Sequence, residues 1–153
     1  MLQIYIDGDA CPVKQEIYRV AARYGLPVFV AAASWMRIPS DGQVTLEVTG
    51  DDPDAADDWI AAHIGPDDIA ITADIPLASR CLEKGAFVLG NTGKPFSDGN
   101  IGQALATREI LSSLRDLGEA TGGPRPFSKA DRSRFLQQLD QAIQKIPRKH
   151  ARD

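Results

Sequence analysis

The fold is decided by the stretch Leu2-Gln3-Ile4-Tyr5-Ile6-Asp7-Gly8-Asp9-Ala10-Cys11-Pro12, an apolar run that ends in two carboxylates around a glycine. Residues 2–6 predict a strand that is buried on both faces of a parallel sheet. Asp7 and Asp9 then lie at the carboxyl end of this strand, the edge where open α/β sheets hold their ligands. Pro12 suits the first turn of a helix, because its missing N–H has no helical partner there anyway. A functional site is therefore expected at this edge.

Apolar segments alternate with segments of helical periodicity along the rest of the chain. Strands are predicted over residues 27–32, 44–48, 68–72 and 86–89. Helices are predicted over residues 12–24, 54–64, 76–84, 100–117 and 129–146. This order predicts an α/β protein, a three-layer α/β/α domain whose mainly parallel central sheet has about five strands. The domain is expected to span residues 1–146, followed by a basic tail over residues 147–153.

The composition narrows the class of protein. The 153 residues include only two cysteines, which are too few for a disulfide framework and lack the spacing of zinc ligands. No apolar run approaches the ~20 residues of a membrane span and no secretory signal pattern is present, so we expect a cytoplasmic protein without a membrane partner. The net charge of −4 argues mildly against a nucleic-acid partner, because binding to phosphates depends on Lys and Arg.

Three later segments also bring acids to the boundary of a predicted element. They are Asp54, Asp57 and Asp58 at the start of one helix, Asp74 after the 68–72 strand, and Asp98 before the 100–117 helix. Carboxylates gathered in one crevice repel one another, which raises their pKa values unless a cation neutralises them, and a divalent metal is the usual remedy. Asp57 and Asp58 also have a simpler explanation, since the helix dipole favours acids in a first turn without any function.

Metal-dependent cleavage of a phosphodiester requires carboxylates that hold magnesium or manganese through hard oxygen ligands. Two such ions ~3.5–4 Å apart can stabilise both the attacking and the leaving oxygen. The ligands would be Asp7, Asp9, one or both of Asp57 and Asp58, and Asp74. No Ser-His-Asp or Cys-His arrangement competes, because the chain has only two histidines.

Other reactive or aromatic side chains have alternative interpretations. Trp35, in a loop over residues 34–40, could stack on a base, although a lone tryptophan is more often partly buried packing. His63 is expected to be a surface or half-buried residue rather than a metal ligand. Cys11 and Cys81, at the base of one helix and on the apolar face of another, are expected to be packed thiols.

Several motifs resemble those of a known bacterial family. They are Ile4–Lys14, Asp54–Ile60, Ile71–Cys81, Asn100–Leu105 and Thr121–Phe135. These segments look like the YaiI/YqxD family, which is grouped with PIN-like folds. The resemblance implies a PIN-like domain with an acid after the first strand, an acid on a following helix and an acid after a central strand in a Thr-x-Asp-like context. This sequence departs from the family pattern at Gly8, where alanine is common in the family. No change of reaction is expected from this glycine.

The resemblance implies roles for individual acids. By position in PIN-like nucleases, the candidate catalytic residues are Asp7, Asp57, Asp58 and Asp74. The candidate metal ligands are Asp7, Asp9, Asp58 and Asp74, and the cofactor is a divalent metal, magnesium or manganese. The favoured function is a metal-dependent nuclease that cleaves RNA phosphodiesters, with single-stranded RNA as partner. The candidate nucleic-acid contacts are Lys14, Arg80, Arg125 and Arg132.

Two other functions remain open at this point. A non-catalytic module that binds RNA or a protein partner would use its arginines, including Arg108, and keep the acids without chemistry. A phosphatase would use Asp7-Gly8-Asp9 as an Asp-x-Asp motif, with the first Asp as nucleophile and the second as general acid. In that motif Cys11 replaces the expected threonine, and no convincing downstream lysine and acid pair is present.

Overall fold

The computed structural model describes residues 2–116 and 127–146. The strands are β1 (Ile4–Asp7), β2 (Val28–Ala32), β3 (Val44–Val48), β4 (Ile69–Ile71), β5 (Phe87–Leu89) and β6 (Pro95–Phe96). The helices are the short 3₁₀ turn η1 (Gly8–Ala10), α1 (Lys14–Tyr24), α2 (Ala55–His63), α3 (Ile75–Glu83), α4 (Asp98–Asp116) and α5 (Lys129–Lys145). Within the described ranges, none of the helices is long and apolar enough to cross a membrane.

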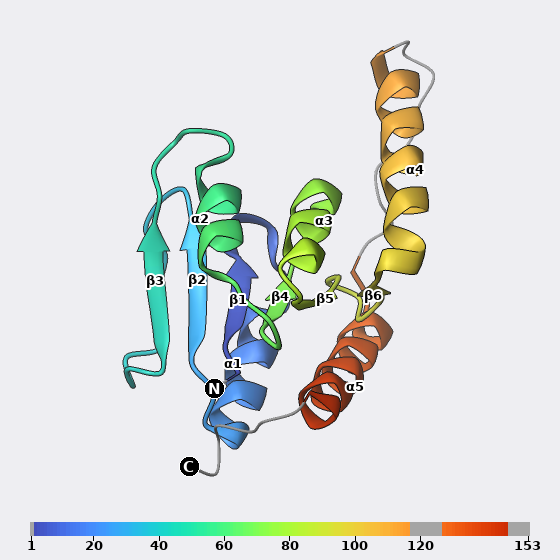
Figure 1. The fold of residues 1–153 in the computed structure, drawn as a ribbon. Coiled ribbons are helices and arrows are strands. Elements are labelled where there is room, and N and C mark those ends of the chain that lie inside the picture. The colour runs from blue at the N-terminus through green and yellow to red at the C-terminus, as the bar shows by residue number, and fades with distance from the viewer. Residues whose placement is uncertain (1, 117–126, 147–153) are drawn as a thin grey trace.

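The strands form one sheet in the order β3-β2-β1-β4-β5-β6. Strand β1 pairs in parallel with β2 on one side and with β4 on the other, and the pairs β2–β3 and β4–β5 are also parallel. The chain first moves outward from β1 to β3 and then returns to β4, so the order of strands reverses between β1 and β4 (Figure 1). In open α/β sheets ligands bind at such a reversal, outside the carboxyl ends of the strands.

Helices cover both faces of the sheet, which confirms the expected three-layer α/β/α arrangement (Figure 1). Helices α1 and α5 pack on one face, in a core that includes Ile4 and Ile6 of β1, while α2 and α3 pack on the other face with Tyr5. Because side chains alternate along a strand, Asp7 leaves β1 on the same face as Tyr5. The carboxylate at the end of β1 is therefore directed to the side that α2 and α3 cover.

Helix α4 packs on α3 and projects away from the sheet (Figure 1). Its base is fixed to the β6 segment by Asn100, whose side chain accepts the Ser97 N–H and donates to the Pro95 carbonyl. Farther along the helix, the apolar side chains of Ile110 and Leu111 are 61% and 47% exposed. Helix α4 thus joins the protein through α3 and the β5–β6 hairpin, and its outer part is largely open to solvent.

The predicted order of strands and helices is confirmed, with small changes at the ends of elements. Gly25 ends α1 in the left-handed conformation, and Ser128 opens α5 with a capping box. Helix α1 begins at Lys14 rather than at Pro12, because η1 and a turn through Pro12 come first. The expected five strands are joined by β6, which pairs antiparallel with β5. The predicted tail over residues 147–153 lies outside the described residues.

Gly8 has little room for a larger residue. A Cβ added there would stand 2.6 Å from Val30 Cγ1 and 3.1 Å from the Ala31 carbonyl oxygen, and Val30 is fully buried. We expect Gly8→Ala to lower the free energy of unfolding by about 1–3 kcal/mol, as overpacking of a filled core does. Chemical denaturation of the two proteins measures this difference.

The control for this prediction is Gly102→Ala, because a Cβ at this position on α4 meets nothing within 4 Å. Adding alanine there should be neutral or slightly stabilising, since glycine is a poor helix former. In a Val30→Ala background the cost of Gly8→Ala should fall, because the clashing methyl group is gone. An equal cost of Gly8→Ala in both backgrounds would show that Val30 is not the obstacle.

Candidate active site

The buried hydroxyl of Thr72 connects two of the predicted site acids. Thr72 follows β4, is only 2% exposed, and donates a hydrogen bond from Oγ1 to Asp7 Oδ2 at 3.2 Å. The same oxygen accepts the backbone N–H of Asp74 at 2.9 Å. Asp7 and Asp74 follow neighbouring central strands, because β1 and β4 are paired. The sequence marks Thr72 only as part of a Thr-x-Asp context, and its link between these acids depends on the tertiary structure.

Asp74 begins helix α3. Its carboxylate Oδ1 accepts the backbone N–H of Leu77 at 3.0 Å, and Pro76 occupies the first turn, where its missing N–H needs no partner. This cap holds one oxygen of Asp74 on the helix. The cap and the Thr72 contact together fix Asp74 at the carboxyl edge of the sheet, beside the end of β1.

Asp57 joins this group from the first turn of α2. Its pKa is raised to about 6, first by burial and then by the negative charges of Asp74, Asp7 and Asp54, while Arg80 lowers it. The pKa of Asp7 is raised as well, first by burial, against the lowering effect of the Thr72 hydrogen bond, and then by Asp74 and Asp9. Asp7, Asp57 and Asp74 therefore form a group of carboxylates that repel one another, which we call the acid cluster.

The acid cluster is not a preformed metal cage. Among the described residues, no group of three or more His, Cys, Asp or Glu side chains is arranged so that it could hold a metal ion. Magnesium does not require such a cage, since it usually keeps several waters and is bound through one or two carboxylates together with substrate phosphates. The oxygen donors of the acid cluster and their mutual repulsion suit a hydrated hard cation of this kind.

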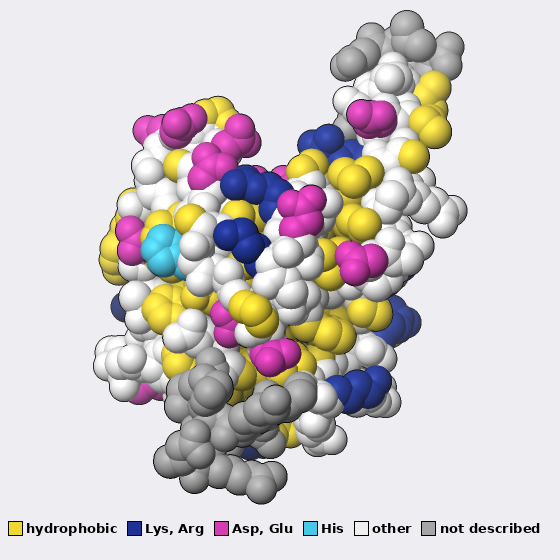
Figure 2. Space-filling model, in the orientation of Figure 1, with side chains coloured by type: hydrophobic (Ala, Val, Ile, Leu, Met, Phe, Trp, Pro, Cys, Tyr) yellow, Lys and Arg dark blue, Asp and Glu magenta, His cyan; other side chains and the backbone are white. Residues whose placement is uncertain are grey.

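The two other acids proposed as metal ligands have partners elsewhere. Asp9 lies near enough to raise the pKa of Asp7, but its carboxylate accepts the Ala33 N–H, at 3.0 Å for Oδ2 and 3.3 Å for Oδ1. Asp58 forms an exposed ion pair with Arg80, with Oδ1 2.8 Å from Nη1. Figure 2 shows acidic and basic side chains together on the surface between α2 and α3. Within the described structure, Asp9 borders the acid cluster and Asp58 stands outside it.

The predicted nucleic-acid contacts fall into two groups. Lys14 lies beside the acid cluster, donates from Nζ to the Gly8 carbonyl at 2.8 Å and lowers the pKa of Asp7. Arg80 also lies near the acid cluster, because its charge lowers the pKa of Asp57. Arg132 instead donates to Glu16 and to the Pro12 carbonyl and lies 5.0 Å from the centroid of the Phe127 ring. Arg125 lies outside the described residues.

Trp35 corrects one expectation. A lone tryptophan was expected to be partly buried, but Trp35 is 74% exposed, because its neighbours Met36 and Ile38 supply the packing against the core instead. The residue two positions before it, Ala33, is the one that binds Asp9. His63 is an exposed residue stacked on Trp59, as expected of a surface histidine. An exposed aromatic ring therefore lies in the segment that adjoins the acid-bearing edge.

Comparison with known proteins shows to which family this chain belongs. Residues 5–145 match the model of the family described as "Uncharacterized BCR, YaiI/YqxD family". The chain belongs to the YaiI/YqxD family. It is 56% identical over 146 residues to a UPF0178 protein of Rhodopseudomonas palustris (strain BisB18), an alignment that covers 95% of this chain and 94% of the relative. It is also 56% identical over 148 residues to a UPF0178 protein of Paramagnetospirillum magneticum (strain AMB-1), covering 97% and 98% of the two chains.

The family assignment confirms the resemblance that the sequence motifs indicated. The acid cluster and Thr72 all lie within the part of the chain that matches the YaiI/YqxD model. No solved structure matches the chain. The relation to PIN-like folds therefore stays a prediction.

The acid cluster should cost stability at neutral pH. Because the folded-state pKa of Asp57 is raised, the folded protein binds more protons than the unfolded chain between pH ~3.8 and about 6, so stability falls as pH rises through this window. Asp57→Asn removes this penalty. At pH 7.5 in chelator we expect the variant to be more stable by on the order of 1 kcal/mol, reduced from a full value of ~3 kcal/mol because the side chain is partly exposed.

Thermal or urea unfolding at pH 7.5 and at pH 3.5 measures this effect. Most of the gain should be lost at the lower pH, where the carboxyl is largely protonated in both states. Asp41→Asn is the matched control, because Asp41 lies before β3, at the opposite edge of the sheet, and its interaction with the Gln43 N–H uses an oxygen that asparagine keeps. A destabilised Asp57→Asn at pH 7.5 would contradict the repulsion.

The two cysteines should be unreactive in the folded protein. Both are buried, and burial is the main cause that raises the pKa of Cys11 to about 11 and that of Cys81 to about 12. Since the thiolate is the nucleophile, iodoacetamide at pH 7.5 should modify neither residue except through unfolding. Mass spectrometry with and without urea checks this, and rapid modification of the native protein would require a thiol mechanism to be considered.

Proposed function

We propose that this member of the YaiI/YqxD family is a magnesium- or manganese-dependent ribonuclease with a PIN-like active site formed by the acid cluster. The observation that carries the proposal is the electrostatic coupling of Asp7, Asp57 and Asp74 at the reversal of the strand order, with the pKa of Asp57 raised to about 6. Three carboxylates from separate elements lie at the edge where this type of sheet binds ligands. Nearby cations neutralise their charge only in part.

The residues of the acid cluster would have separate roles in the reaction. Asp7 and Asp74, fixed by Thr72, would hold the divalent cation, which supplies Lewis-acid stabilisation of phosphate oxygens and an activated water. Asp57, whose pKa lies near neutrality, is suited to accept the proton of the attacking water. The water oxygen forms the new bond to phosphorus, and the bond from phosphorus to the leaving ribose oxygen breaks. Asp9, whose carboxylate accepts the Ala33 N–H, would help to position Asp7.

Single-stranded RNA is the substrate that the surroundings favour. Lys14 and Arg80 provide positive charge beside the acid cluster, and the exposed ring of Trp35 can stack on a base, a contact that only an unpaired strand offers freely. We place the protein in the cytoplasm, where its two buried thiols stay reduced.

The phosphatase alternative is less favoured by the geometry. It requires the second acid of Asp7-Gly8-Asp9 to donate a proton to a leaving group. Both carboxylate oxygens of Asp9 instead lie within 3.3 Å of the Ala33 nitrogen. A non-catalytic RNA-binding module remains the main alternative, and it differs from the nuclease by the absence of any metal-dependent product.

The decisive experiment uses Asp74→Asn. Asparagine can still cap α3 through its side-chain oxygen, so the fold should persist while the charge that holds a cation is lost. Wild type should cleave labelled single-stranded RNA in manganese and not in chelator, and the variant should be slower by at least about 100-fold. RNA affinity in chelator should stay equal or rise, because one negative charge facing the phosphates is removed.

Asp41→Asn serves again as the control and should cleave at the wild-type rate. Release of phosphate from a generic monoester, abolished by Asp7→Asn, would favour the phosphatase. The absence of metal-dependent cleavage by wild type would favour the non-catalytic module. Product that persists unchanged in Asp74→Asn would point to a contaminating nuclease and remove the support for this proposal.

A further inference from the structure

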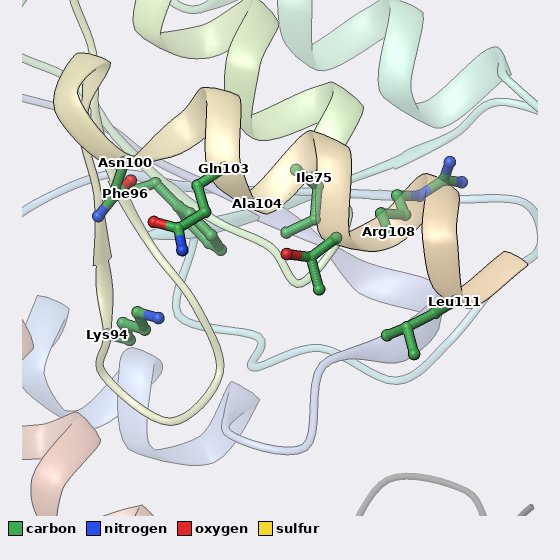
Figure 3. A pocket seen from close by; sticks show the side chains of 9 residues that line it. Ile75, Lys94, Phe96, Asn100, Gln103, Ala104, Arg108 and Leu111 are labelled. Carbon is green, nitrogen blue, oxygen red and sulfur yellow. The ribbon is translucent and has the colours of Figure 1, made fainter. Parts of the chain in front are cut away.

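A pocket of about 520 Å³ lies beside the acid cluster, between α4, the β6 segment and the start of α3 (Figure 3). Its lining includes Ile75, the residue that directly follows Asp74. It also includes Phe96 of β6 and several residues of α4, and Figure 3 shows Gln103 and Phe96 among the side chains that line it. The pocket therefore begins at the residue next to a proposed metal ligand, on the β5–β6 side of the sheet.

The chemistry of the lining is specific. Lys94 and Arg108 supply two cations, and no acidic side chain of the described residues contributes to the lining. Neither cation has an ion-pair partner among residues 2–116 and 127–146. Positive charge that the described residues do not neutralise is thus available at the pocket, within a chain whose net charge is −4.

The remaining lining groups suit a flat ring with polar edges. Phe96 presents an aromatic ring, and Ile75, Ala104 and Leu111 add apolar surface. Gln103 makes no hydrogen bond within the described part of the chain, so its amide can both donate and accept. Asn100 differs, since its side chain is already used to fix the base of α4. A mostly apolar cavity with a few convergent polar groups, of a size between ~300 and ~1,000 Å³, is typical of sites for small organic groups.

We propose that this pocket binds one nucleotide of the RNA strand, next to the bond that the acid cluster cleaves. The base stacks on Phe96 and meets the amide of Gln103, and its phosphates contact Lys94 and Arg108. The class of ligand rests on the proposed function, while the site itself rests on the cavity, its unpaired cations and its aromatic ring. The apolar rim at Ile110 and Leu111 identifies a second copy of the chain as the competing occupant.

The test measures binding without cleavage. Fluorescence anisotropy in EDTA measures the affinity for a labelled single-stranded oligoribonucleotide. Arg108→Ala and Lys94→Ala should each weaken binding about 5- to 10-fold. Each should also reduce the slope of log affinity against log salt concentration by about one phosphate contact. Ala104→Trp should weaken binding by a similar factor, because a bulky side chain on the pocket wall takes the space of the base. All three positions are at least partly exposed, so folding should be preserved.

Lys84→Ala is the matched control, because Lys84 is an exposed cation at the far end of α3 from Ile75. Equal affinities of Arg108→Ala, Lys94→Ala and Lys84→Ala overturn the pocket proposal, even if wild type cleaves RNA in manganese. Unchanged RNA affinity of Ala104→Trp together with an altered elution volume in gel filtration overturns it in favour of a second copy. Selective loss of affinity in the pocket variants supports it, even if no cleavage by wild type is found and the nuclease proposal fails.

Discussion

Strand β1 is paired on both edges, and this constraint places everything at the candidate site. With β2 on one side and β4 on the other, β1 cannot shift without breaking two parallel ladders. Its last residue, Asp7, is therefore held at the carboxyl edge, where the strand order reverses. Thr72 at the end of β4 then bonds to Asp7 and positions Asp74, so the two central strands fix the distance between two carboxylates.

This arrangement concentrates negative charge that the protein only partly compensates. Lys14 and Arg80 both lower pKa values in the acid cluster, yet the pKa values of Asp7 and Asp57 stay raised. Both cations also have other partners, Lys14 on the Gly8 carbonyl and Arg80 on Asp58. A fold selected for stability alone would not keep this repulsion, since one asparagine would relieve it. The uncompensated charge is the physical reason to expect a cation, and a functional one, at this edge.

The layered fold could be predicted from the sequence because it depends on short patterns. The apolar runs of β1, β2 and β4, the glycine after α1 and the capping box of α5 are all local signals. Strand β6 has only two residues and begins with proline, so it has no such pattern. The start of α1 was predicted two residues too early for a similar reason, because η1 is a three-residue turn with no periodicity. The exposure of Trp35 depends on which of its neighbours pack inward, which no spacing rule decides.

The acids of the candidate site could be predicted from the sequence, but their hydrogen-bond and ion-pair partners could not. Asp7 and Asp74 are marked by the strands that precede them, whereas the contacts that divert Asp9 to Ala33 and Asp58 to Arg80 depend on tertiary structure. The link through Thr72 joins residues 65 positions apart in the chain. The pocket beside Ile75 was missed for the same reason, since α3, β6 and α4 enclose it only when folded.

The position of the pocket also bears on how an anionic substrate can approach an acidic edge. A phosphate that comes near Asp7, Asp57 and Asp74 is repelled by each of them until a cation is bound. Affinity for the proposed RNA substrate would therefore come from groups beside the acids rather than from the acids themselves. Lys94 and Arg108 meet this requirement on the β5–β6 side, and Trp35 offers uncharged stacking in the loop after β2. In the proposed ribonuclease, RNA binding and chemistry would therefore belong to separate groups of side chains.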